Sequence, residues 1–95
     1  MDQHRLKNKT VNITGGAKNL GGLIARKFAK QGANLVIHYN SLETQADADA
    51  TLKDVEQLGS KAILIQADLS NIQEIENLFI QAKETFGGVD IAINT

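Results

Sequence analysis

Short apolar runs alternate with longer amphipathic stretches along this chain of 95 residues. The runs are rich in β-branched residues and are bounded by turn residues, which is typical of strands. The longer stretches repeat apolar residues every three or four positions, which is typical of helices with one buried face. The pattern predicts strands at residues 10–14, 33–39, 61–66 and 89–94, and helices at residues 19–31, 40–58 and 70–86.

Each predicted helix carries an apolar stripe that we expect to face the core. The strand at residues 33–39 is apolar in a nearly continuous run, as expected for a strand covered on both faces. The expected core positions of the helices are Leu20, Leu23, Ile24 and Phe28 in the first, Leu52, Val55 and Leu58 in the second, and Ile72, Ile75, Leu78, Phe79, Ala82 and Phe86 in the third.

The ends of the predicted helices carry capping signals. A glycine follows each helix, at Gly32, Gly59 and Gly87, where a left-handed C-terminal cap is expected. At the starts of the second and third helices, the spacing of a capping box occurs in the pairs Asn40 with Glu43 and Ser70 with Gln73.

Three strand–helix units in succession predict parallel strands joined by right-handed crossovers. The expected fold class is therefore α/β, a Rossmann-type three-layer αβα arrangement whose parallel sheet has the strand order 3-2-1-4. A flavodoxin-type phosphate-binding domain, with strand order 2-1-3-4, is the alternative. In such sheets ligands bind beyond the carboxyl ends of the strands, where the strand order reverses.

Composition excludes several classes of protein. A chain that is 42% hydrophobic and 22% charged is neither disordered nor embedded in a membrane, and no apolar run is long enough to span one. The absence of cysteine excludes disulfides and thiolate metal sites and favours the cytoplasm, and the polar segment at residues 1–5 does not resemble a signal peptide. Neither His4 nor His38 has a carboxylate at metal-binding spacing, so no metal site and no role is assigned to them.

Charge is distributed unevenly along the chain. Residues 1–30 hold seven of the ten basic residues and one of the eleven acidic residues, although the net charge of the whole chain is -1. This asymmetry indicates either ordinary solvated helix faces or a positive field near an anion site. A nucleic-acid partner is not expected, because aromatic residues are few and no dense basic run occurs.

A glycine-rich loop joins the first predicted strand to the first predicted helix. Glycine allows a sharp turn and a close approach by a pyrophosphate, and the N–H groups at the helix start then face the anion. The loop is not a Walker A motif, which needs Lys and Ser or Thr after its last glycine, and it lacks the G-x-G-x-x-G pattern. Its residues are Thr14-Gly15-Gly16-Ala17-Lys18-Asn19-Leu20-Gly21-Gly22.

The spacing Thr14-Gly15-x-x-x-Asn19-x-Gly21 resembles the T-G-x-x-x-G-x-G loop of the short-chain dehydrogenase/reductase family. Asp68-Leu69, after the third strand, is similar to the family's Asp-Val/Leu pair. Asp90 to Thr95 resembles its D-x-x-V-N-N-A-G strand, with Thr95 in place of the second asparagine. Asn19 replaces a glycine of the family, but asparagine tolerates a positive φ, and its amide could donate to a phosphate or cap the helix.

The resemblance implies a dinucleotide cofactor and a set of residues that bind it. Asp68 would accept from the adenine amino group or act as a turn residue, and Asn94 would tie the central strands together near the cofactor. The implied cofactor-binding residues are Gly15, Ala17, Lys18, Asn19, Leu20, Gly21, Tyr39, Asn40, Ser41, Asp68, Leu69 and Asn94.

The end of the second strand favours NADP(H) over NAD(H) as that cofactor. A carboxylate at this place normally binds the adenosine ribose of NAD, and none occurs from His38 to Ser41. Lys18 stands where many NADP-preferring members of the family carry a basic residue, and Asn40 and Ser41 could bind a 2′-phosphate. Glu43 could replace the missing acid, but its capping position explains it better.

The family's catalytic residues, a serine and a Tyr-x-x-x-Lys motif, do not occur in this sequence. Tyr39 is the only tyrosine, and Glu43 rather than lysine follows it by four positions. The resemblance therefore implies that residues 1–95 are the N-terminal cofactor-binding part of a longer single-domain enzyme. That enzyme would transfer hydride between NADP(H) and a small carbonyl or alcohol substrate and form a dimer or tetramer. A non-catalytic dinucleotide-binding module is the alternative.

Overall fold

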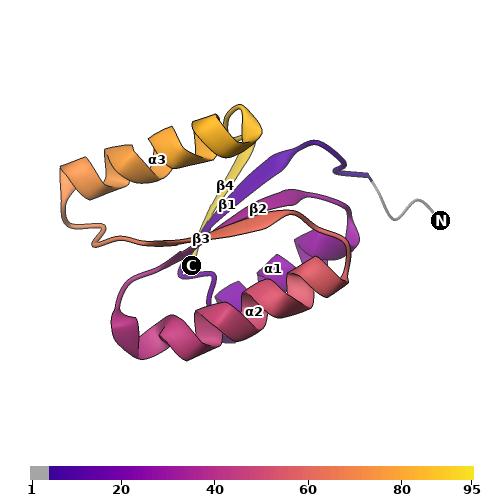
Figure 1. Ribbon diagram of the computed structural model, residues 1–95, viewed down its shortest axis with the longest axis horizontal. Coiled ribbons are helices and arrows are strands. Elements are labelled where there is room, and N and C mark those ends of the chain that lie inside the picture. Colours follow the sequence, from indigo (N-terminus) through magenta and orange to yellow (C-terminus); the bar gives the residue numbers. More distant parts are fainter. Residues whose placement is uncertain (1–4) are drawn as a thin grey trace.

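The computed structural model describes residues 5–95, in which four parallel strands form one sheet (Figure 1). His4 and most of the polar N-terminal segment lie outside the described residues. The observed strands start up to two residues later than the predicted ones. They are β1 (Thr10–Thr14), β2 (Asn34–Tyr39), β3 (Ala62–Gln66) and β4 (Ile91–Asn94).

The order of the strands in the sheet is β3-β2-β1-β4, which confirms the predicted order and excludes the flavodoxin-type alternative. Val11 of β1 lies between Leu35 of β2 and Ile91 of β4. The central strands β1 and β2 are buried almost throughout, so the continuous apolar run of β2 is covered on both faces as predicted.

Helices cover both faces of the sheet, as the three-layer fold requires. In Figure 1, α1 and α2 lie on one side of the strands and α3 lies on the other. An ion pair of 2.7 Å between Arg26 and Asp54 joins α1 to α2. The helices are α1 (Asn19–Lys30), α2 (Gln45–Gln57) and α3 (Ile72–Phe86), and a short 3-10 helix, η1 (Leu42–Thr44), precedes α2.

Helix α1 packs on the sheet through small residues. Its buried positions are Gly21, Gly22, Ala25 and Ala29, whereas Leu20 and Leu23 are 62% and 54% exposed. The prediction that these two leucines face the core is wrong, because a helix that approaches a sheet this closely leaves room only for small side chains. Ile24 and Phe28 pack against the core as predicted.

Helix α2 starts later than residue 40. The side-chain amide of Gln66 donates to the Asn40 carbonyl, which holds Asn40 beside β3 and outside the helix. Within the described residues, no side chain caps η1 or α2, so the predicted Asn40–Glu43 capping box is wrong. Of the three expected core positions Val55 is buried, Leu52 is half-buried and Leu58 is exposed, and the remaining buried positions are Ala48 and Thr51.

Helix α3 is capped by Asn71, one residue after the predicted cap. The Asn71 side chain accepts from the N–H groups of Gln73 and Glu74, at 2.9 and 3.3 Å, whereas Ser70 bonds to Asp68. The Ser70–Gln73 capping box is therefore wrong. Two expected core positions are also wrong, because α3 contacts the sheet along a narrow line that buries Leu78 and Ala82 and leaves Ile72 and Phe79 exposed.

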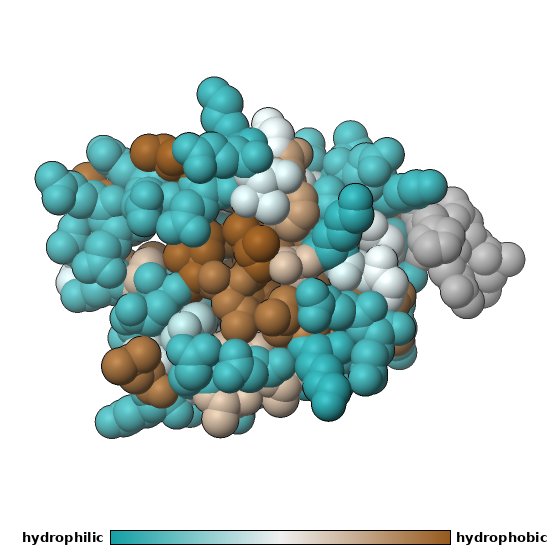
Figure 2. All heavy atoms as spheres, viewed as in Figure 1, coloured by the Kyte–Doolittle hydropathy of each residue, from teal (hydrophilic) through white to brown (hydrophobic). Residues whose placement is uncertain are grey.

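The glycines after the helices have the expected left-handed backbone. Their φ angles are 83° at Gly32, 94° at Gly59 and 87° at Gly87. Figure 2 shows apolar side chains gathered in the middle of the face between α3 and α2, with polar side chains around them. Within residues 5–95, no helix combines the length and the apolar character needed to cross a membrane.

Candidate functional site

A cavity of about 360 Å³ lies at the carboxyl ends of β1 and β2. Eight of the predicted cofactor-binding residues line it, and Thr44 and Thr95 line it in addition. Ser41, Asp68, Leu69 and Asn94 are not among its lining residues. The lining residues are Gly15, Ala17, Lys18, Asn19, Leu20, Gly21, Tyr39, Asn40, Thr44 and Thr95.

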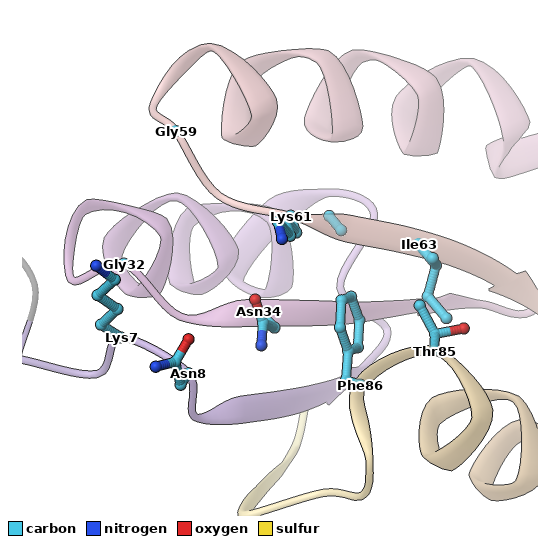
Figure 3. Close-up of a pocket in the computed structure, with 10 residues that line it drawn as sticks. Lys7, Asn8, Gly32, Asn34, Gly59, Lys61, Ile63, Thr85 and Phe86 are labelled. Carbon is cyan, nitrogen blue, oxygen red and sulfur yellow. The ribbon is translucent and has the colours of Figure 1, made fainter.

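A larger hollow, of about 570 Å³, lies at the opposite ends of the strands (Figure 3). Its lining includes Lys7 and Lys61, which stand apart in Figure 3, and the turn glycines Gly32 and Gly59. Ligands of open parallel sheets bind beyond the carboxyl ends of the strands, and this hollow lies at the amino ends. The smaller cavity is therefore the candidate site.

The glycine loop adopts a backbone that few other residues tolerate. Gly15 has a φ of +66°, and a Cβ atom at Gly21 would lie 1.9 Å from the Gly15 carbonyl oxygen. Asn19 has a φ of 54°, which confirms that asparagine here accepts a positive φ. Lys18 and not Asn19 is the N-cap residue of α1, so the capping alternative for Asn19 is wrong.

Backbone N–H groups at the start of α1 lie at the cavity. The first N–H to bond within the helix is that of Gly22, which donates to the Lys18 carbonyl. The preceding N–H groups, of Asn19, Leu20 and Gly21, belong to the first turn, which has no acceptor inside a helix. The first turn holds no acidic residue, and Lys18 is the basic residue that lines the cavity. The site thus has the donors and the charge of an anion site.

Threonine hydroxyls bond the glycine loop to α2 and to the end of β4. The buried Thr51 hydroxyl of α2 donates to the Ala17 carbonyl at 2.6 Å. The Thr95 hydroxyl donates to the Thr14 carbonyl at 2.5 Å, and the Thr14 hydroxyl donates to the Asn94 side chain at 2.7 Å. Asn94 therefore joins β4 to β1 beside the loop. Sequence reasoning missed Thr51 and noted Thr95 only as a departure from the family pattern.

His38, to which the sequence suggested no role, also contacts the loop. It is buried at the end of β2, and its ring bonds to the Gly15 N–H and to the Ala67 carbonyl. A polar residue within an otherwise apolar buried strand is the only sequence signal that could have indicated this contact.

The segment after β2 forms the wall beside Lys18. Tyr39 is buried, and its hydroxyl donates to the Gln45 side chain at 2.6 Å. Asn40 lines the cavity, whereas the Ser41 carbonyl accepts from the Thr44 hydroxyl at 2.8 Å and turns the chain into η1. Thr44, which the sequence analysis did not single out, thereby reaches the cavity.

Asp68 acts as a turn residue after β3. Its carboxylate accepts from the Ser70 hydroxyl at 2.7 Å and from the Ser70 N–H at 2.9 Å. These two bonds hold the pKa of the Asp68 carboxyl below its usual value, because they stabilise the charged form. Leu69 is exposed next to it.

Comparison with known proteins gives a family match over nearly the whole chain. A family model described as short chain dehydrogenase matches residues 9–95. The chain is 43% identical over 89 residues to 3beta-hydroxysteroid dehydrogenase 1 of Eggerthella lenta, a match that covers 94% of this chain and 33% of that protein. The chain thus spans about a third of the length of the curated relatives it matches.

Some solved structures with the same fold contain a nicotinamide dinucleotide. A protein of Burkholderia cenocepacia, solved with bound NADP, is 52% identical, with a TM-score of 0.89 over 97% of this chain and 35% of that one. A protein of Haemophilus influenza, solved with bound NAD, is 29% identical, with a TM-score of 0.82 over 94% of this chain and 31% of that one. Both forms of the cofactor therefore occur among structures similar to this chain.

Proposed function

The chain belongs to the short-chain dehydrogenase family, and from that premise we propose that it is the cofactor-binding part of an oxidoreductase that uses NADP(H). The observation that carries the proposal is the cavity at the carboxyl ends of β1 and β2, onto which the start of α1 opens. Relatives such as 3beta-hydroxysteroid dehydrogenase 1 are dehydrogenases, which supports an oxidoreductase of this kind.

The glycine loop fits the pyrophosphate of such a cofactor. The N–H groups of Asn19, Leu20 and Gly21 would donate to its oxygens, and the positive end of the α1 dipole would stabilise its charge. A pyrophosphate must approach the backbone closely, and Gly15 lines the cavity without a side chain of its own. The pyrophosphate would thus be held by the backbone.

We propose NADP(H) rather than NAD(H) because of the residues around the end of β2. A 2′-phosphate there would meet the Lys18 ammonium and the polar groups of Asn40 and Ser41. From His38 to Ser41 no carboxylate is present to repel it. One similar structure with bound NADP and one with bound NAD make both forms plausible ligands, so the preference rests on these residues.

The remaining predicted residues would hold the adenosine half and the central strands. Asp68 would accept from the adenine amino group through a carboxylate oxygen that its turn leaves free, with Leu69 against the ring. Asn94 would keep β4 and β1 together beside the cofactor, in line with its bond to Thr14. Ala17, Leu20 and Tyr39 would form the wall of the cavity.

When bound, the nicotinamide cofactor supplies or accepts the hydride that interconverts a carbonyl and an alcohol. Since residues 1–95 lack the family's serine and its Tyr-x-x-x-Lys motif, they would bind and orient the cofactor but not move the substrate's proton. We propose that they are the N-terminal part of a longer single-domain enzyme, on the ground that they match a third of each relative. A small carbonyl or alcohol substrate, a dimeric or tetrameric assembly and a cytoplasmic location belong to the same proposal.

Calorimetric titration of the full-length protein with NADP⁺ and with NAD⁺ tests this proposal. We expect both to bind, and NADP⁺ to bind about tenfold or more tightly, a difference of at least ~1.4 kcal/mol. Oxidation of simple secondary alcohols with NADP⁺ then distinguishes an enzyme from a non-catalytic binding module. Failure of both nucleotides to bind would contradict the proposal.

A further inference from the structure

His38 lies between the two segments of the chain that border the proposed cofactor site. It is 2% exposed at the end of β2, with the glycine loop on one side and the segment after β3 on the other. Ring atom Nδ1 lies 3.0 Å from the Gly15 backbone nitrogen, and ring atom Nε2 lies 2.8 Å from the Ala67 carbonyl oxygen. Both ring nitrogens therefore have a backbone partner.

These partners allow one protonation state of the ring. The Gly15 N–H is a donor, so Nδ1 must carry a lone pair to accept from it. The Ala67 carbonyl is an acceptor, so Nε2 must carry the proton to donate to it. Only the neutral imidazole with its proton on Nε2 satisfies both, and the bond to Ala67 favours that tautomer.

His38 accepts hydrogen bonds from two successive N–H groups of the glycine loop. The Gly15 N–H donates to the ring, and the Gly16 N–H donates to the His38 backbone carbonyl at 2.9 Å. Both donors are thereby directed toward β2, which leaves the N–H groups at the start of α1 to face the cavity. Gly15 makes its bond from a backbone with a φ of +66°, a conformation in which an unrestrained chain spends only part of its time.

We propose that His38 is a positioning residue for the dinucleotide: its neutral ring fixes the loop at Gly15 in the conformation that the cofactor binds. The bond to Ala67, the residue before Asp68, fixes the orientation of the ring and links the loop to the segment proposed to meet the adenine. This role rests on the proposed function, because it concerns the affinity for the cofactor. It needs no contact between His38 and the cofactor itself.

A buried histidine can also stabilise the fold without influencing the loop, and two isosteric substitutions separate these roles. In His38→Asn, the Oδ1 atom can take the place of Nδ1 and accept from the Gly15 N–H, while the bond to Ala67 is lost. In His38→Gln, the Nε2 atom can keep the bond to Ala67, while the acceptor for the Gly15 N–H is lost. Each variant thus removes one of the two bonds.

The test is calorimetric titration of NADP⁺ into the full-length wild-type protein and both variants, with thermal unfolding measured in parallel. We expect His38→Gln to raise the Kd for NADP⁺ about tenfold, because the Gly15 N–H loses the acceptor that fixes the loop, and His38→Asn to stay within about threefold of wild type. Both variants should lower the Tm, since each loses one hydrogen bond of the buried ring. Equal changes in Kd for the two variants would overturn the role of His38.

Nitrogen NMR of the wild-type protein tests the same bond without a substitution. We expect the His38 ring to show an unprotonated Nδ1 and a protonated Nε2, and a hydrogen-bond coupling between Nδ1 and the Gly15 amide. A proton on Nδ1 would overturn the proposal whatever the variants do. Wild-type protein that binds neither NADP⁺ nor NAD⁺ would instead overturn the proposed function, an outcome distinct from equal binding by the two variants.

Discussion

The carboxyl ends of the strands carry a cavity of about 360 Å³, whereas the amino ends border a hollow of about 570 Å³. The smaller cavity is surrounded by a backbone held at several points, by His38, Thr51 and Thr95. The larger hollow is lined by the turn glycines Gly32 and Gly59 and by lysines that stand apart. The two ends of the strands therefore differ in what borders their hollows, the start of a helix at the carboxyl ends and the turns after two helices at the amino ends.

We infer from this difference that the proposed dinucleotide site depends on convergent backbone donors and not on volume. At the carboxyl edge, an α-helix starts at Asn19 and directs its first N–H groups at the cavity. At the amino ends, α1 and α2 finish at the turns that contain Gly32 and Gly59, so the carbonyl ends of two helices and not a helix N-terminus lie there. Matched substitutions at the carboxyl and the amino ends of the strands test this difference.

The largest effect is expected from Gly21→Ala, compared with Gly59→Ala. The new Cβ atom at position 21 would lie 1.9 Å from the Gly15 carbonyl oxygen, so the loop must move. We expect affinity for NADP⁺ to fall about a hundredfold in the full-length protein. A Cβ atom added at Gly59 would meet no atom of a non-neighbouring residue within 4 Å. Gly59→Ala should therefore cost about 1 kcal/mol of stability through its positive φ and leave the Kd unchanged. Calorimetry and chemical denaturation measure the two quantities, and unchanged affinity in Gly21→Ala would contradict the loop's role.

A smaller effect, specific to one cofactor, is expected from Lys18→Glu, compared with Lys61→Glu. Reversing the charge at Lys18 replaces attraction of a 2′-phosphate by repulsion, so the Kd for NADP⁺ should rise about thirtyfold and that for NAD⁺ only about threefold. Lys61 lines the opposite hollow, and its reversal should change neither value. Equal losses for the two cofactors in Lys18→Glu, read from calorimetric titrations, would remove the case for NADP(H).

Thr51→Val should have a weaker effect on binding, compared with Ser60→Ala. Each substitution removes a buried hydroxyl that donates to a backbone carbonyl, Ala17 in the first case and Ala33 in the second. Both should lower the free energy of unfolding by about 1–2 kcal/mol. Of these two residues, Thr51 alone bonds to the glycine loop, so only Thr51→Val should raise the Kd for NADP⁺, by about threefold. A rise of similar size in Ser60→Ala would show that stability alone sets the affinity.

The smallest effect on binding is expected from Asn71→Ala, which removes the N-cap of α3. This cap lies at the carboxyl ends of the strands, as the cavity does. The loss of two accepted N–H bonds should lower the free energy of unfolding by about 1 kcal/mol, as measured by urea denaturation. Affinity for NADP⁺ should stay unchanged, because no residue of α3 lines the cavity. A loss of affinity in this variant would show that the start of α3 contributes to the site.

The sequence predicts the strand order and the position of the glycine loop because both depend on local patterns. Alternating strands and helices leave few parallel arrangements, and the spacing of Gly15, Asn19 and Gly21 marks the turn between β1 and α1. The left-handed glycines after the helices are predicted for the same reason, since helix ends are local features.

The exact faces of the helices and the bonds that hold the loop could not be predicted. Leu20 and Leu23 are exposed because α1 lies so close to the sheet that Gly21 and Gly22 occupy the contact, a distance that periodicity does not encode. His38 and Thr51 bond to loop residues more than twenty positions away. Such pairs become visible only when the strands and helices are placed in space.

Hydrogen–deuterium exchange of the full-length protein, with and without NADP⁺, tests most directly where the dinucleotide binds. We expect NADP⁺ to slow exchange in peptides covering residues 15–22, where the amides at the start of α1 would gain acceptors. Peptides covering residues 59–63, at the amino ends of the strands, should exchange at the same rate with and without NADP⁺. Slower exchange at residues 59–63 with none at residues 15–22 would contradict the account.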